Sequence, residues 1–136
     1  SPKIIPYGTP EELSLIESYF FLLKKRYNDN LNLSISLDQR LKNSLIPPMT
    51  LQILIENAVK HNIISKDKPL FIKVYDDNEK IVVENNLQPK LTAEKSTGIG
   101  LDNIRKRYRL ITKSVIEINM SENLFKIILP ILNQNH

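Results

Sequence analysis

Cysteine and tryptophan are absent from this chain of 136 residues, and glycine occurs only three times. The lack of cysteine excludes disulfide bonds and cysteine-bound zinc, and it is compatible with a reducing compartment. No apolar run approaches the roughly 20 residues that a membrane-spanning helix needs. The opening SPKIIPYGTP also lacks the charged-then-apolar form of a signal peptide. We therefore expect no membrane span within this sequence.

The composition is that of an ordinary globular protein, with 41% hydrophobic and 25% charged residues and no low-complexity tract. We predict one domain over residues 1–136, and we expect it to be a C-terminal fragment of a longer protein because the chain has no initiator Met. The formal net charge is +4. The basic residues are interleaved with acids, so we interpret them as solvated surface with a few phosphate contacts and expect no direct nucleic-acid binding.

The most informative stretch is IPPMTLQILIENAVKHN, from Ile46 to Asn62. Proline suits a helix entrance, and Pro47 and Pro48 stand there. One side of the expected helix is apolar, and polar residues gather at its edge. An amide, an ammonium and an imidazole within one turn suit a metal-bound polyphosphate, although such a polar edge often only faces solvent. The apolar residues are Leu51, Leu54, Ile55, Ala58 and Val59, and the polar ones are Glu56, Asn57, Lys60 and His61.

A second stretch, Ser96 to Leu101, carries two of the three glycines and leads into the helical pattern LDNIRKRYRLI. Glycine lets the backbone approach a ligand closely, and the N-terminus of a helix offers unpaired N–H groups to an anion. The pattern therefore indicates a phosphate site. A lone Gly-x-Gly also serves ordinary turns, so its weight comes from its combination with Glu-Asn-Ala-x-Lys-His.

These two motifs resemble a known family. LQILIENAVKHN is similar to the N box, and STGIGLDNIRKRYRLI to the G box, of the ATP-binding domain of sensor histidine kinases, especially the LytS-like group. Gyrase and MutL belong to the same superfamily. The resemblance runs from about Tyr7 to Pro130. It implies an α+β fold, a two-layer α/β sandwich of the Bergerat type with a mixed, mainly antiparallel sheet and helices on one face.

Residue patterns predict elements in the same order. The first helix begins after the cap Thr9 and runs to about Tyr27, and its aromatic residues suit the core. Alternation and turn residues predict the strands. The polar segment from Pro89 to Ser96 is interpreted either as a mobile lid over a nucleotide or as an ordinary connecting loop. Predicted after the first helix are a strand over 31–37, a hairpin of 70–75 and 80–85, a helix over 101–111, and a hairpin of 114–119 and 124–129.

The resemblance also assigns roles to single residues. It makes Asn57 the Mg²⁺ ligand and brings Lys60 and His61 to the phosphates of ATP. Glu56 would orient Asn57 or accept a proton. Arg105 and Arg107 are either phosphate contacts or surface ion pairs. Backbone N–H groups would come from Gly98, Ile99, Gly100 and Leu101, and lid contacts from Lys95 and Thr97.

The chain departs from the family at three points. Asn85-Asn86-Leu87 replaces the Asp-x-Gly that reads adenine, so Asn85 becomes the expected adenine contact. Ile53 stands where ATP-hydrolysing relatives have a glutamate, so hydrolysis should be poor. The phosphate-accepting histidine is missing, because His61 lies in the expected site and His136 ends the chain.

The resemblance therefore implies a domain that donates phosphate without receiving it. It would pass the γ-phosphate of Mg·ATP to a histidine on an upstream dimerisation domain of the same polypeptide, in a homodimer, for a response regulator. The domain would be cytoplasmic and its parent protein anchored in the bacterial inner membrane. The alternative is a degenerate module of the same fold that senses nucleotide or contacts proteins without kinase activity.

Overall fold

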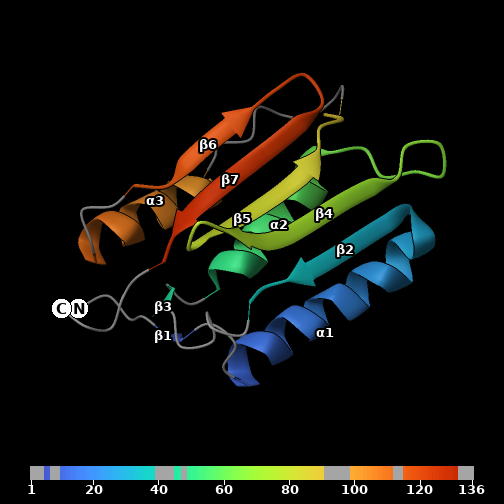
Figure 1. Cartoon of the computed structure of the whole chain (residues 1–136). Coiled ribbons are helices and arrows are strands. Elements are labelled where there is room, and N and C mark those ends of the chain that lie inside the picture. The colour runs from blue at the N-terminus through green and yellow to red at the C-terminus, as the bar shows by residue number, and fades with distance from the viewer. Residues whose placement is uncertain are drawn as a thin grey trace.

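Helices cover one face of a five-stranded sheet (Figure 1). The computed structural model describes residues 5–6, 10–38, 45–46, 49–90, 99–111 and 115–131. Two further strands, β1 (Ile5–Pro6) and β3 (Leu45–Ile46), pair with each other outside this sheet. The helices are α1 (Pro10–Tyr27), α2 (Thr50–His61) and α3 (Ile99–Ile111), with a 3-10 turn at Asn28–Asn30. The sheet contains β2 (Leu31–Ser36), β4 (Leu70–Asp77), β5 (Lys80–Asn86), β6 (Glu117–Met120) and β7 (Leu124–Pro130).

The strand order is β2-β4-β5-β7-β6, and only the β2–β4 pair is parallel. Parallel neighbours need a crossover connection, and α2 lies within the connection between β2 and β4. The other pairs are antiparallel, and short turns join β4 to β5 and β6 to β7. The predicted mixed, mainly antiparallel sheet with helices on one face is confirmed.

The core lies between the inner face of the sheet and the helices. Alternate residues of the central strands point inward, and the apolar stripe of α2 packs against them. Helix α2 also packs against α1 and α3, so it is the most enclosed of the described helices. The buried residues of the sheet include Leu70, Ile72, Val74, Ile81, Val83, Ile127 and Leu129, and those of the helices include Ile16, Leu23, Leu51, Leu54, Ile55, Ala58, Val59, Ile104 and Tyr108.

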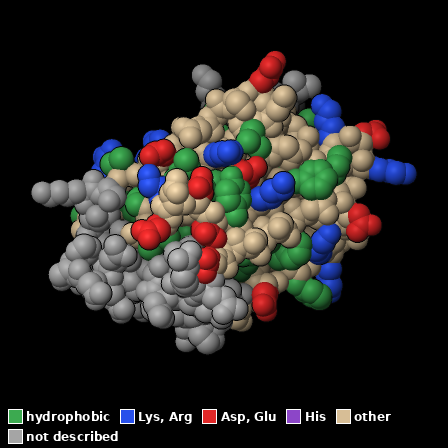
Figure 2. Space-filling view, in the orientation of Figure 1, with side chains coloured by type: hydrophobic (Ala, Val, Ile, Leu, Met, Phe, Trp, Pro, Cys, Tyr) green, Lys and Arg blue, Asp and Glu red, His purple; other side chains and the backbone are tan. Residues whose placement is uncertain are grey.

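The outer face of the sheet carries charge instead. Lys73, Glu84 and Lys126 stand directly opposite one another on β4, β5 and β7, so the signs alternate across the strands. Tyr75 donates a hydrogen bond to Glu84 on the same face. Figure 2 shows acidic and basic side chains interspersed over the face in view. Opposite charges on neighbouring strands stabilise the pairing by roughly 0.2–1 kcal/mol per pair.

The predicted entrance to the central helix is wrong at its first residue. Ile46 belongs to β3, and α2 begins only at Thr50. Met49 has φ 65° and cannot continue a right-handed helix backwards, while a residue before proline, as Ile46 is, avoids helical angles. Pro47 and Pro48 lie outside the described residues.

Other boundaries shift by one to three residues. Helix α3 begins at Ile99 instead of 101, so Ile99 and Gly100 belong to its first turn. Strand β6 begins at Glu117 instead of 114. The β4–β5 turn is shorter than expected because Asn78 and Glu79 take φ of 50° and 63°. Positive φ at both turn positions is the geometry of the tight hairpin that matches strand twist, which lets the two strands extend further.

The buried hydroxyl of Tyr108 yields a stability prediction. Tyr108 is fully buried on α3, and its hydroxyl has no hydrogen-bond partner among the residues that the structure describes. Burying an unpaired polar group costs about 1–3 kcal/mol, so Tyr108→Phe should keep or raise the free energy of unfolding in urea. Its neighbour Ile104 provides the contrast, since Ile104→Ala should lose about 2–5 kcal/mol. A loss above about 1 kcal/mol in Tyr108→Phe would contradict the unpaired hydroxyl.

Candidate functional site

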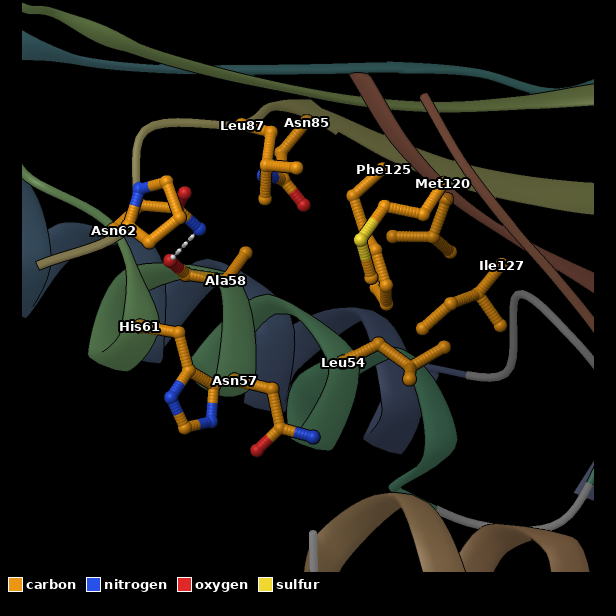
Figure 3. Close-up of a pocket in the computed structure, with 12 residues that line it drawn as sticks. Leu54, Asn57, Ala58, His61, Asn62, Asn85, Leu87, Met120, Phe125 and Ile127 are labelled. Carbon is orange, nitrogen blue, oxygen red and sulfur yellow. Dashed lines mark hydrogen bonds between the residues drawn. The ribbon is translucent and has the colours of Figure 1, made fainter. Parts of the chain in front are cut away.

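A cavity of about 340 Å³ lies between α2 and the β5–β7–β6 side of the sheet (Figure 3). Its size is within the range of small-molecule sites, and its walls are mainly apolar with a few polar groups. Helix α2 supplies one wall, and β5 with the segment after it supplies the other. The lining residues are Leu54, Asn57, Ala58, His61, Asn62, Val83, Asn85, Leu87, Pro89, Met120, Phe125 and Ile127.

Asn57 and His61 lie one turn apart on α2, and Figure 3 shows them side by side at one edge of the cavity. Their position follows from the packing of the helix. Leu54 and Ala58 are buried against the sheet, and Asn57 and His61, beside them on the helix surface, are left half-buried at the margin. The predicted polar edge of this helix therefore faces a cavity and not only solvent.

Asn85 reaches the same cavity from β5. Its side chain is only 5% exposed, and its Nδ2 donates to the backbone carbonyl of Asn86 at 2.8 Å. This bond identifies which end of the Asn85 carboxamide is the NH2 group, because an oxygen at that position would face the carbonyl oxygen of Asn86, which is also an acceptor. Oδ1 is then directed towards the cavity, as Figure 3 shows. The cavity thus contains a fixed hydrogen-bond acceptor.

The segment after β5 is held to the end of α2. Asn62 donates to the carbonyl of Ala58 at 2.9 Å and accepts from the N–H of Gln88 at 2.8 Å. The N–H of Lys90 donates to the carbonyl of His61 at 3.1 Å. These bonds fix the backbone on both sides of Pro89, so the walls formed by Leu87 and Pro89 are held at a set distance from α2.

The electrostatic environment of His61 favours its neutral form. Partial burial is the main cause that lowers the pKa of the imidazole, and the ammonium groups of Lys60 and Lys90 lower it further. Both lysines are exposed. The cavity edge at His61 therefore combines a neutral imidazole with two cations, which is an arrangement that attracts an anion.

Of the other predicted site residues whose side chains the structure describes, none lines the cavity. Glu56 is exposed. Burial is the main cause that raises the pKa of Tyr19 on α1, and the charge of Glu56 raises it further. Arg105 pairs with Asp102 at 3.9 Å on the surface of α3. Ile99, Gly100 and Leu101 form the first turn of α3, which packs against α2. Outside the described residues lie Lys95, Thr97 and Gly98, and the side chain of Arg107 is not described.

Comparison with known proteins connects this arrangement to a family. No protein-family model matches the chain. The sensor histidine kinase/phosphatase LytS of Staphylococcus aureus is 30% identical over 88% of this chain, and the sensor protein LytS of Staphylococcus saprophyticus is 34% identical over 71%. The chain is homologous to the LytS sensor histidine kinases. It spans only 24% and 19% of the length of these two relatives.

Solved structures confirm the fold of this LytS-type domain. The catalytic domain of the histidine kinase ThkA superposes with a TM-score of 0.60, covering 98% of this chain and 99% of that one at 15% identity. The cytoplasmic segment of the histidine kinase QseC gives 0.62, covering 96% of this chain and 78% of that one at 13% identity. The predicted fold is therefore confirmed, and the predicted family is confirmed by the LytS homology.

Several lining residues of the LytS-type domain had no role in the sequence analysis. Strand alternation places Phe125 on the same side as Ile127, which would have suggested an inward position without indicating a cavity. Asn62, which lines the cavity, and Gln88, which bonds to it from outside the lining, carried no local signal. Among the described residues, no group of three or more His, Asp or Glu gathers to hold a metal, and no described helix is long and apolar enough to cross a membrane.

The environment of His61 yields a prediction on pH. Its pKa should lie below the ordinary 6.5, and Lys90→Met should raise it, because one of the causes that lower it is removed. NMR titration of the imidazole resonances measures both values, with His61→Gln identifying the signal. Lys73→Met, on the outer face of the sheet, should leave the pKa unchanged.

The same shift affects stability with a defined sign. Because folding lowers the pKa of His61, its contribution to stability is present above pH 6.5 and is lost as the pH falls through the lower folded-state value. The free energy of unfolding of His61→Gln should therefore decline less between pH 7.5 and 5 than that of the parent chain. Equal declines would show that His61 titrates alike in both states.

Proposed function

We propose that this chain is the ATP-binding catalytic domain of a two-component sensor histidine kinase. The observation that supports it best is that Asn57, His61 and Asn85, from two elements far apart in the sequence, line one cavity. The LytS homology and the histidine kinase fold support the same reading. The domain binds Mg·ATP and holds the γ-phosphate for attack by a histidine located outside this chain.

The base of ATP fits the inner part of the cavity. Leu54, Val83 and Ile127 give it apolar walls that suit a planar heterocycle. The Oδ1 of Asn85 is an acceptor at the end of β5, and the amino group of adenine is a donor. An Asn thus replaces the family's Asp as the group that accepts from adenine. Leu87 adds a side chain where the family has glycine, which narrows this end.

The phosphates belong at the α2 edge. The carboxamide oxygen of Asn57 is a hard ligand suited to Mg²⁺, which usually takes few protein ligands and completes its octahedron with phosphate oxygens and water. Magnesium supplies neutralisation of phosphate charge. Lys60 and His61 would contact the same anionic groups. We assign the backbone N–H groups of residues 98–101 and the side chains of Lys95 and Thr97 to the β- and γ-phosphates.

Catalysis by this domain rests on positioning. Ile53, at the place of the base in ATP-hydrolysing relatives, is half-buried against the core and cannot activate water. Glu56 would orient Asn57 or accept a proton during transfer. The acceptor histidine would come from an upstream dimerisation domain of the same polypeptide, in a homodimer, and the phosphate would pass to a response regulator. We place this domain in the cytoplasm and its parent protein in the bacterial inner membrane.

Binding of an ATP analogue with Mg²⁺ tests the site. Asn57→Ala should weaken Mg²⁺-dependent binding about tenfold or more in a calorimetric titration, because the metal loses its protein ligand. Binding measured with EDTA present should change little. Asn119→Ala, an exposed amide on the outer side of β6, is the matched control. Unchanged affinity in Asn57→Ala would remove the assignment.

A second candidate is a module that binds nucleotide or protein without transferring phosphate. Asn85 and Leu87 favour it, because both depart from the family's adenine motif. The two candidates share the cavity and differ only in what happens to the γ-phosphate.

Phosphate transfer separates them. When the purified domain is mixed with a separately expressed LytS-type histidine domain and γ-labelled ATP, a kinase labels that histidine domain, and Asn57→Ala should abolish the label. Acid-labile radioactivity after gel electrophoresis is the measurement. Nucleotide binding without any label would favour the sensing module.

A further inference from the structure

Gln88 uses every polar group it has. Its backbone N–H donates to Asn62 Oδ1 at 2.8 Å, and its backbone carbonyl accepts from the N–H of Ile63 at 2.8 Å. Its side-chain Nε2 lies 2.7, 2.8 and 3.2 Å from the carbonyls of Ile63, Lys68 and Pro69. Two N–H groups are thus shared among three acceptors of the loop between α2 and β4.

Asn86 continues the network towards the cavity. Its Nδ2 donates to Pro69 at 3.0 Å and to Oε1 of Gln88 at 3.3 Å, while its Oδ1 accepts from the N–H of Phe71 at 2.7 Å. The side chain of Asn86 is therefore fixed at both ends. Its own backbone carbonyl is held in place as a result, and this carbonyl is the one that accepts from Asn85 Nδ2.

We propose that Gln88 is a positioning residue that determines base specificity by fixing, through Asn86, which end of the Asn85 carboxamide faces the cavity. This inference rests on the proposed nucleotide site. With Oδ1 directed into the cavity, Asn85 accepts a hydrogen bond from the amino group of adenine. The 6-oxo group of guanine is itself an acceptor, so Oδ1 would repel it. Without the network, the carboxamide can rotate and present Nδ2, which donates to the 6-oxo group instead.

The ratio of two affinities tests the proposal. Calorimetric titrations with Mg²⁺ and the non-hydrolysable analogues of ATP and GTP should show that the parent chain prefers the ATP analogue by about tenfold or more, as sites built around a base-specific hydrogen bond do. Gln88→Met fills similar space but removes all side-chain bonds. Asn86→Asp keeps the side-chain oxygen that accepts from the N–H of Phe71. It loses the hydrogen bonds that Nδ2 donates to Pro69 and Gln88. Both variants should bring the ratio of the two affinities close to one.

A control variant and the choice of temperature separate a change in base specificity from a loss of stability. Asn119→Asp makes the same chemical change as Asn86→Asp on the exposed outer side of β6, and it should leave the ratio unchanged. All titrations are run well below the unfolding midpoint that circular dichroism gives for each variant. A loss of stability alone weakens both analogues alike and preserves the ratio, so an unchanged ratio in both variants overturns the proposal.

Failure of the proposed function has a different signature. If the parent chain binds neither analogue, the nucleotide site itself is refuted. If it binds both equally, the site stands and the role of Gln88 is refuted, because there is no discrimination for Gln88 to maintain.

Discussion

The burial of the apolar stripe of α2 against the inner face of the sheet is the interaction on which the rest of the structure depends. Leu51, Leu54 and Ile55 are at most 2% exposed, and together their burial contributes several kcal/mol to folding. The same contact sets the rotation of the helix about its axis. It therefore decides that Asn57 and His61 stand at the cavity margin and Glu56 on the exposed surface. The same helix therefore contributes its apolar face to the core and its polar edge to the candidate site.

Most of the architecture could be predicted from the sequence because periodicity records burial. The first helix and both hairpins follow from such patterns. Errors occurred where one backbone angle overrides the pattern, as at Met49, whose left-handed conformation makes the helix begin at Thr50 and leaves Ile46, the first residue of the predicted stretch, in β3. The β1–β3 pair was not predicted, because two-residue strands carry no periodic signal.

The site was predictable to a smaller extent. Helical spacing was enough to place Asn57 and His61 together, whereas Asn85 required the resemblance to a family, because nothing local connects it to α2. The hydrogen-bond network of Gln88 could not be predicted from the sequence. Its partners are backbone carbonyls of an irregular loop, and backbone groups carry no sequence information. Gln88 and Asn62 are also polar residues of types that usually face solvent.

The parallel pairing of β2 with β4 has a consequence for how the molecule assembles. Each hairpin closes a short stretch of chain, but β2 meets β4 only after residues 37–69 have been gathered between them. Closing that longer loop costs more chain entropy, and pairings distant in sequence are slower to form. The β5–β7 pairing beneath the cavity also closes a long stretch, residues 87–123. The two hairpins are thus the units that form first, and both the α1 margin of the sheet and the β5–β7 seam depend on later, long-range closure.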